Sequence, residues 1–368
     1  MGARPKKGER KMAVIRVGSI GIGAISRHVH LPGIQRSPDL QLVAVCDVDP
    51  EALAWARENY GVDEAHCFTD YHDLIACPDV DAVDISTPND CHFEIALEAA
   101  RAGKPYAVEK PLTLSSEQAD TLARVTEENH VPSMVCFSYR FKAAARYARD
   151  LVRRGVIGKL YHVDMQYYQA WALPFCETPL KWRFVRERTG SGALGDLGSH
   201  ALDLVRFVTG QEYTRLVSHT GTFIHERKLE DGSGTGKVDV DDFSNYMAEM
   251  DGGTAATFRI TRYAFGRGNY QTMELYGSDG AIQYELDHAA PDVDEISVCI
   301  GHFNGQTHVF SKLPIPQEYY CDQMQAFADI INGKADGLAA NIVDGQVNQH
   351  AVDAVIRSAE TGVWETVE

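Results

Sequence analysis

The sequence lacks the features that mark membrane proteins, nucleic-acid-binding proteins and disulfide scaffolds. Basic residues are scarce, since 35 Lys and Arg stand against 52 Asp and Glu and leave a net charge of −17. Such a chain repels a phosphate backbone. No apolar run approaches the roughly 18 residues that cross a bilayer. The eight cysteines include no C-x-x-C pair, which argues against a zinc ribbon and a disulfide framework. We expect a cytoplasmic protein that binds neither nucleic acid nor membrane.

The chain is too long for one ordinary core. Its 368 residues predict two domains. Residues 1–12 hold the one basic cluster and lack the apolar segment of a signal peptide, so we expect a disordered leader. We assign residues 13–138 to a nucleotide-binding domain and residues 139–368 to a substrate-binding domain.

Two patterns of secondary structure follow each other along the chain. Up to residue 137, strands predicted near 14–20, 40–47, 81–86, 105–109 and 133–137 alternate with helices near 25–36, 50–60, 92–102 and 116–129. This alternation predicts a doubly wound parallel sheet, the Rossmann type of α/β fold. Later, alternating runs such as LYHVDMQYYQ and GTAATFRITR predict a large, mostly antiparallel open sheet. Helices are expected there near 143–154, 196–208, 318–333 and 344–361, and a loop at 230–237.

The first predicted strand is followed by a glycine-rich turn. Gly21 and Gly23 stand between this strand and a helix, with Ala24 and Ile25 at the helix start. Glycines let the pyrophosphate of a nucleotide approach the N–H groups at the helix N-terminus. The third position of the G-x-G-x-x-G pattern is Ser26 instead of glycine, and such a cluster by itself is also compatible with an ordinary turn.

An acidic residue strengthens the nucleotide prediction. Asp47 follows the second predicted strand, where a carboxylate accepts hydrogen bonds from the adenosine ribose and repels a 2′-phosphate. Alone, Asp47 could instead cap the helix that begins near Pro50. Together with the glycine turn, it predicts NAD as the cofactor.

Polar residues follow two further strands of the same predicted sheet. Thr87, Pro88 and Asn89 follow one, and Glu109 and Lys110 follow another. Because the carboxyl ends of parallel strands form the ligand crevice, we expect these residues to face the nucleotide.

The stretch GALGDLGSHALD places Asp196, His200 and Asp203 at spacings of four and three. On an α-helix these residues share a face, which suits an acid/base pair, a hydrolytic centre or a metal. No further His or Cys stands at ligand spacing, so we predict no metal site. We expect Asp203 to cap or pair within the helix packing, and Arg140 and Arg262 to form salt bridges.

Several motifs together resemble one family. STPNDCH, AGKPYAVEKPL, GALGDLGSHALDL and DGQVNQHAVDAVIRSAETGVW are similar to segments of the Gfo/Idh/MocA oxidoreductases, which include glucose-fructose oxidoreductase and inositol dehydrogenase. The resemblance implies a Rossmann domain and a C-terminal α/β domain that assembles homodimers or homotetramers. It also implies NAD-dependent oxidation or reduction of a ring hydroxyl on a sugar, glycoside or cyclitol. Lys110, Asp196 and His200 match the family's catalytic positions.

These three side chains suit the oxidation of a secondary alcohol, in which a hydride and a proton leave together. A neutral His200 can accept the proton near neutral pH. Asp196 would favour the resulting imidazolium, and Lys110 would stabilise negative charge on the substrate oxygen.

Further substrate contacts are expected from a strand and from a loop. Trp182 and Arg183 precede the glycine cluster and could position a loop or bind the substrate. Hydroxyl and amide side chains suit a polyol, and one face of the strand predicted at 160–169 carries polar side chains: His162, Asp164, Gln166 and Tyr168.

Three functions remain compatible with these residues. The first is an NAD-dependent dehydrogenase that releases its cofactor after each turnover. The second keeps NAD bound and oxidises and then reduces its substrate, as in a glycosidase-like cycle. The third is a non-catalytic nucleotide-sensing regulator, which the presence of Lys110, Asp196 and His200 argues against.

The Asp47 assignment predicts a strong preference for NAD over NADP. Replacing Asp47 with Ser removes the carboxylate that repels the 2′-phosphate, so the difference between the two dissociation constants should narrow. Calorimetric titration of both nucleotides into the two proteins measures this difference. Equal affinities for NAD and NADP in the unmodified protein would contradict the assignment.

Overall fold

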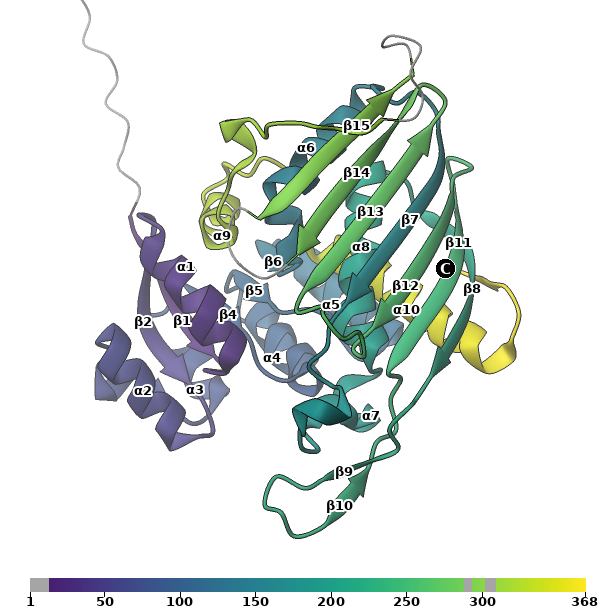
Figure 1. Ribbon diagram of the computed structural model, residues 1–368. Coiled ribbons are helices and arrows are strands. Elements are labelled where there is room, and N and C mark those ends of the chain that lie inside the picture. Colours follow the sequence, from purple (N-terminus) through teal and green to yellow (C-terminus); the bar gives the residue numbers. More distant parts are fainter. Residues whose placement is uncertain (1–12, 288–292, 302–308) are drawn as a thin grey trace, which may run out of the picture.

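The computed structural model describes residues 13–287, 293–301 and 309–368. The leader predicted for residues 1–12 lies outside the described residues. Within these residues the chain forms two large sheets, each with helices packed on it (Figure 1). None of the described helices is both long and apolar enough to cross a membrane.

The N-terminal sheet confirms the predicted parallel Rossmann arrangement. Its strand order is β3-β2-β1-β4-β5-β6, with every pair parallel. The side chains of β4 and β5 are buried on both faces, as expected when helices cover both sides of a parallel sheet. The strands are β1 (Ile15–Ile20), β2 (Leu40–Cys46), β3 (Cys67–Phe68), β4 (Ala82–Ile85), β5 (Tyr106–Val108) and β6 (Ser133–Val135).

Helices cover the N-terminal sheet on both sides. On one side α1 (Leu31–Arg36), α2 (Pro50–Tyr60) and α9 (Gln323–Ile331) share a core. On the other lie α3 (Tyr71–Ala76), α4 (Asn89–Arg101) and α5 (Ser116–Glu128). Helix α9 returns from the C-terminal part of the chain to pack on α1 and β6. Gly33 permits this contact, because a Cβ there would lie 2.6 Å from Met324 Cγ.

The C-terminal sheet is mixed and mostly antiparallel, as predicted. Its order is β16-β15-β14-β13-β7-β12-β11-β8-β17, and within this sheet only β7 and β12, of the described strands, pair in parallel. Its longer strands are β7 (Leu160–Tyr168), β8 (Tyr213–Gly221), β11 (Phe243–Met250), β12 (Ala255–Thr261), β13 (Tyr270–Gly277), β14 (Gly280–Asp287) and β15 (Asp294–Ile300). The edge strands are β16 (Ser311–Lys312) and β17 (Glu365–Thr366).

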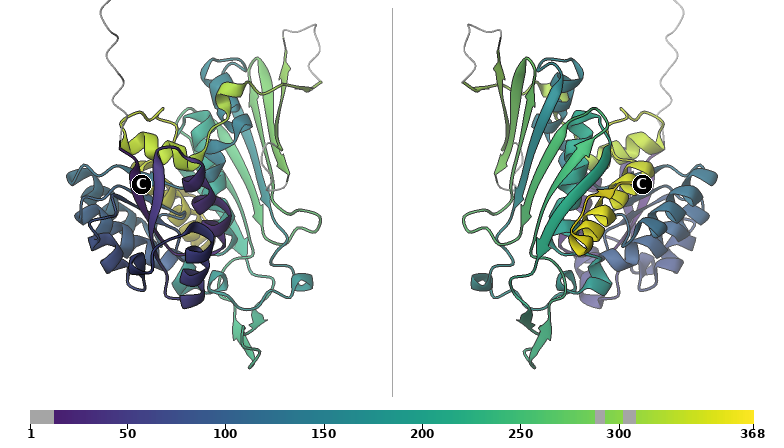
Figure 2. Two further views of the ribbon diagram at one scale, coloured as in Figure 1. Left: turned by 90° about the vertical axis from the view of Figure 1, so that its left-hand side faces the viewer. Right: turned by 90° about the vertical axis from the view of Figure 1, so that its right-hand side faces the viewer.

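One face of the C-terminal sheet packs against helices, and none of the helices in the described part of the chain lies on the other (Figure 2). The covering helices are α6 (Ala143–Arg153), α8 (Ser199–Thr209) and α10 (Ile342–Thr361). Side chains alternate between the faces, so Val163, Met165 and Tyr167 of β7 are buried beneath these helices. A short helix, α7 (Arg186–Thr189), precedes the glycine cluster.

The structure differs from the sequence prediction in several short elements. Strand β3 and helix α3 are too short to give a periodic signal. The helix expected at 318–333 begins only at Gln323, because residues 317–319 form a 3-10 turn and Asp322 caps α9. The predicted loop at 230–237 includes β10 (Thr235–Lys237), which pairs with β9 (Glu226–Lys228).

A buried ion-pair network joins the two parts of the chain. Arg140, just after β6, donates to both carboxylate oxygens of Asp203 on α8, at 2.8 and 2.5 Å. It also donates to Asp344 at the start of α10, at 3.2 Å. The ion pairs expected for Arg140 and Asp203 are therefore present, and they hold α8 against the carboxyl edge of the N-terminal sheet.

Candidate active site

A cavity of about 560 Å³ lies where the carboxyl ends of β4 and β5 face the start of α8 and the end of β7. Predicted site residues from both parts of the chain line it: Ala24, Ile25, Thr87, Asn89, Glu109, Lys110, Trp182, Arg183, Asp196 and His200. The predicted residues that do not line it are Gly21, Gly23, Asp47, Pro88 and Tyr168. The first four belong to adjoining loops of the nucleotide crevice.

The glycine turn after β1 has the shape that a dinucleotide requires. Gly21 has φ +89°, and a Cβ there would lie 2.8 Å from the backbone of Ser86, so only glycine fits. Gly23 is exposed, and a Cβ there would meet nothing within 4 Å. Its backbone is thus open to a ligand. The helix begins at Ala24, and its first N–H groups have no acceptor within the helix.

Asp47 lies directly beside this turn. Its Oδ2 accepts the Ile22 N–H at 2.7 Å, and its Oδ1 accepts the Asp49 N–H at 2.9 Å. The carboxylate is half-buried, and each of its oxygens has a second lone pair for a ribose hydroxyl. The turn, the helix start and Asp47 therefore fit the pyrophosphate and adenosine ribose of NAD.

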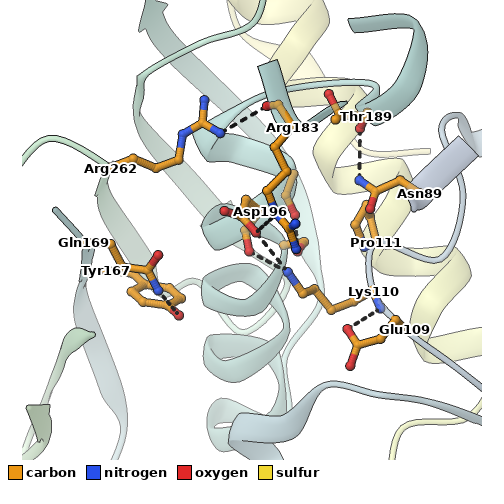
Figure 3. Close-up of polar contacts among 12 residues, drawn as sticks. Asn89, Glu109, Lys110, Pro111, Tyr167, Gln169, Arg183, Thr189, Asp196 and Arg262 are labelled. Atoms are coloured by element: carbon orange, nitrogen blue, oxygen red, sulfur yellow. Dashed lines mark hydrogen bonds and ion pairs between the residues drawn. The ribbon is translucent and has the colours of Figure 1, made fainter. Parts of the chain in front are cut away.

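Lys110 reaches from the end of β5 into the cavity. Its ammonium donates to the Asp196 backbone carbonyl at 2.7 Å and lies 3.5 Å from Asp196 Oδ1 (Figure 3). Its own backbone N–H donates to Glu109 Oε2 at 3.1 Å. The residue thus links the N-terminal sheet to the segment that precedes α8.

Asp196 is the carboxylate on which several cations converge. Burial raises the pKa of Asp196, but the charges of Lys110, Arg183 and Arg262 outweigh this effect and lower the pKa below its usual value. Arg183 Nε lies 3.9 Å from Asp196 Oδ1. Asp196 is therefore ionised at neutral pH and holds the cations of the cavity together.

His200 differs from the sequence expectation in its partners. No hydrogen bond or ion pair joins His200 to Asp196, although both are described residues. Leu194–Gly198 form a π-helical segment, which rotates Asp196 relative to a residue four positions later. Burial, and then the charge of Lys110, lower the pKa of His200 well below its usual value. The imidazole is therefore neutral, and the predicted carboxylate support for its charged form is wrong.

A polar wall next to His200 was missed from the sequence. The Asn269 side-chain oxygen accepts from Tyr139 at 3.1 Å, from Tyr167 at 2.8 Å and from Gln169 at 3.0 Å. The Tyr139 ring also packs edge-on against the His200 ring, with centroids 4.7 Å apart. All four residues of the wall line the cavity. Hydroxyl and amide groups are thus presented beside the imidazole.

The expectation for Tyr168 is corrected by the strand alternation. Successive side chains of a strand point to opposite faces, so Tyr167 reaches the cavity while Tyr168 lies on the helix-free face and packs against Tyr270. His162, Asp164 and Gln166 share the face of Tyr168 and do not line the cavity. The sequence therefore identified the right strand and the wrong face.

Other predicted residues have structural partners in addition to their place at the crevice. The Asn89 amide donates to the Thr189 carbonyl at 3.3 Å, which joins α4 to α7. Pro88 occupies the N-cap position of α4. The Arg183 guanidinium stacks over Trp182, 4.2 Å from the ring centre. Arg262 is fully buried and donates to the Arg183 carbonyl (Figure 3), with Asp242 as a carboxylate 3.7 Å away.

Known proteins show similarity over nearly the whole chain. Residues 15–137 match the oxidoreductase family with an NAD-binding Rossmann fold, and residues 145–283 match the GFO/IDH/MocA C-terminal domain. Levoglucosan dehydrogenase of Pseudarthrobacter phenanthrenivorans is 30% identical over 353 residues, with 88% of each chain covered. Inositol 2-dehydrogenase of Rhizobium meliloti is 28% identical, covering 94% of this chain and 96% of that one. A solved structure of levoglucosan dehydrogenase with NADH and L-sorbose has a TM-score of 0.87 at 29% identity, covering 97% of this chain and all of that one.

The two glycines of the turn should respond differently to alanine. Gly21→Ala forces a side chain into a positive-φ position against the Ser86 backbone, so it should lower the free energy of unfolding by about 1–3 kcal/mol. Gly23→Ala should leave the melting temperature unchanged and weaken NAD binding tenfold or more, because its methyl obstructs close approach of the pyrophosphate. Thermal unfolding and NAD titration of both variants test this difference. A Gly23→Ala protein that melts as early as Gly21→Ala would contradict it.

Proposed function

The chain belongs to the Gfo/Idh/MocA family of NAD-binding oxidoreductases, and from that premise we propose that it transfers a hydride between a ring hydroxyl of a neutral sugar, glycoside or cyclitol and the nicotinamide. Family membership confirms the predicted fold class and cofactor. The substrate class and the roles of individual residues are the content of the proposal.

One observation carries the proposal. Lys110 is distant in the chain from Asp196 and His200, yet all three line one cavity, together with Ala24 and Ile25 of the nucleotide turn. A protein that only sensed a nucleotide would have no need for an ammonium, a carboxylate and a neutral imidazole at this place. Their convergence supports catalysis over regulation.

His200, Lys110 and Asp196 each have a separate role in alcohol oxidation. NAD, when bound, supplies the hydride acceptor. A ring nitrogen of His200 accepts the hydroxyl proton as the carbon–hydrogen bond breaks with its electron pair. The Lys110 ammonium donates a hydrogen bond to the substrate oxygen, which carries developing negative charge. Asp196 positions that ammonium, since Lys110 Nζ is bonded to its carbonyl.

The low pKa of His200 has a consequence for this division. A strongly depressed pKa makes the protonated imidazole costly, so His200 keeps its basic form available at neutral pH. His200 accepts the hydroxyl proton only while the Lys110 ammonium stabilises the negative charge that develops on the substrate oxygen. We therefore propose that Lys110 and His200 act as a pair, with Asp196 acting through Lys110.

The charges of the cavity support a neutral substrate. Lys110 and Arg183 have Asp196 within 4.0 Å, and Arg262 has Asp242 within the same distance. Of the lysines and arginines lining the cavity, Lys181 is the one with no carboxylate partner among the described residues. An acidic substrate needs a free cation, usually an arginine that binds both carboxylate oxygens. The hydroxyls and amides around Asn269 instead suit the hydroxyls of a ring.

The relatives and the bare sheet face support two further parts of the proposal. Levoglucosan and inositol, named in the relatives above, are ring compounds that carry hydroxyls and no charge. We also propose a homodimer or homotetramer assembled through the helix-free face of the C-terminal sheet, where Met247 is half exposed.

Substitution of Lys110 or His200 should separate chemistry from cofactor binding. Lys110→Ala and His200→Ala should each lower kcat on the order of a hundredfold or more, because each removes a group that acts in the transition state. The dissociation constant for NAD should change little. Lys159→Ala, at an exposed lysine outside the cavity, is the matched control and should keep the kcat of the unmodified protein. Normal turnover by either cavity variant would remove that residue from the mechanism.

A substrate panel tests the substrate class. Steady-state NADH formation would be measured with glucose, an inositol, levoglucosan, a methyl glucoside, a uronic acid and lactate. We expect the highest kcat/KM for one of the neutral ring compounds, since Lys110, Arg183 and Arg262 already have carboxylate partners. A kcat/KM for the uronic acid or for lactate above that of every neutral compound would overturn the proposal.

A further inference from the structure

A buried chain of charged groups lies behind the cavity wall. His30, fully buried, stands between two carboxylates: its Nδ1 is 2.6 Å from Asp84 Oδ1, and its Nε2 is 3.0 Å from Glu109 Oε1. Asp84 is fully buried as well and accepts from the Ser19 hydroxyl at 2.9 Å.

The hydrogen bonds determine the charge of this chain. Each ring nitrogen of His30 faces a carboxylate oxygen, so an imidazolium with a proton on both nitrogens satisfies both contacts. The two carboxylates outweigh burial and raise the pKa of His30 to about 10. Burial raises the pKa of Glu109, but the hydrogen bond and charge of His30 lower it overall. One imidazolium between two carboxylates leaves a net negative charge.

The same atoms include a set that resembles a metal site. Ligand atoms of His30, Glu109 and Cys136 lie within 4.8 Å of one another. Both imidazole nitrogens are already bonded to carboxylates, however, and burial together with Glu109 and Asp84 holds the pKa of the Cys136 thiol well above its usual value. A neutral thiol and an occupied imidazole are poor ligands. We therefore interpret His30, Asp84 and Glu109 as a hydrogen-bonded ionic cluster, the His30–Asp84–Glu109 relay, and not as a metal site.

Glu109 is the member of the relay that reaches the cavity. It lines the wall together with Ala24, Ile25 and Thr87, at the end where the nucleotide turn lies. The charge of the Lys110 ammonium contributes to the low pKa of Glu109, but its hydrogen bond is made to Asp196, and only the Lys110 backbone bonds to Glu109 (Figure 3). The cofactor end of the cavity therefore has an ionised carboxylate whose counter-charge, His30, is on the side away from the ligand.

This placement matters because the two redox forms of the cofactor differ in charge. The oxidised nicotinamide ring is a cation, and the reduced ring is neutral. We propose that the His30–Asp84–Glu109 relay keeps Glu109 ionised so that this wall favours the oxidised over the reduced cofactor, with His30 and Asp84 as positioning residues. The inference needs only NAD binding, so it stands or falls independently of the substrate proposed above.

Dissociation constants measured without substrate test the proposal. Glu109→Gln keeps the shape and an oxygen acceptor for His30 but removes the charge. We expect its dissociation constant for NAD⁺ to rise about tenfold, the effect of losing one favourable charge interaction of moderate strength. The constants for NADH and for ADP-ribose, which lacks the nicotinamide, should stay within about twofold. NADH fluorescence and calorimetry provide these values, and unchanged ADP-ribose binding shows that the variant is folded.

Companion variants separate charge from structure. Glu109→Asp keeps the charge and should keep the ratio of the NAD⁺ and NADH constants. Ser19→Ala removes the uncharged hydroxyl that donates to Asp84 and should also keep this ratio. His30→Gln removes the counter-charge, which favours a protonated Glu109, so the ratio should rise as in Glu109→Gln. If Glu109→Gln does not bind ADP-ribose, His30→Gln decides the question. The proposal would be overturned if the deciding variant kept the ratio of the NAD⁺ and NADH dissociation constants, or if it bound both nucleotides equally more weakly.

Discussion

The contact between Lys110 and Asp196 is the interaction on which the site depends. Lys110 comes from the carboxyl edge of the N-terminal sheet, and Asp196 comes from the π-helical segment that leads into α8. An ammonium and a carboxylate this deeply placed each need a counter-charge, since removal of one partner of a buried pair commonly costs about 3–5 kcal/mol. The pairing therefore fixes where the two parts of the chain meet, while burial, together with the charge of Lys110, keeps His200 neutral.

The same requirement explains the other charged groups around the cavity. Arg140 lies between Asp203 and Asp344, and His30 lies between Asp84 and Glu109. In each case a cation is enclosed by two carboxylates from different elements. These enclosed cations hold the helices of both sheets in position around the crevice. Within the cavity itself, Lys110, Arg183 and Arg262 lie within 4.0 Å of Asp196 or Asp242, and this pairing is the basis for proposing a neutral substrate.

Much of this arrangement could be predicted from the sequence because it depends on local patterns. The glycine turn, the position of Asp47 at a strand end and the alternation of strands and helices all follow from short-range geometry. Local patterns also mark the predicted cavity residues. Lys110 follows a predicted strand, and Asp196 and His200 follow a cluster of glycines. Tyr167 was missed because a strand pattern indicates that neighbours face opposite sides and does not say which side is covered.

The sequence by itself determined the fold class, the nucleotide crevice and the residue types available for proton and charge transfer, because these depend on spacing along a few turns or strands. Only the tertiary structure decided which charged groups are partners. Asp196 lies four residues from His200 but pairs with Lys110, which is 86 residues away. His30 meets Asp84 and Glu109 in the same way. Such pairs form where burial removes water from charged groups, and burial is a property of the packed chain.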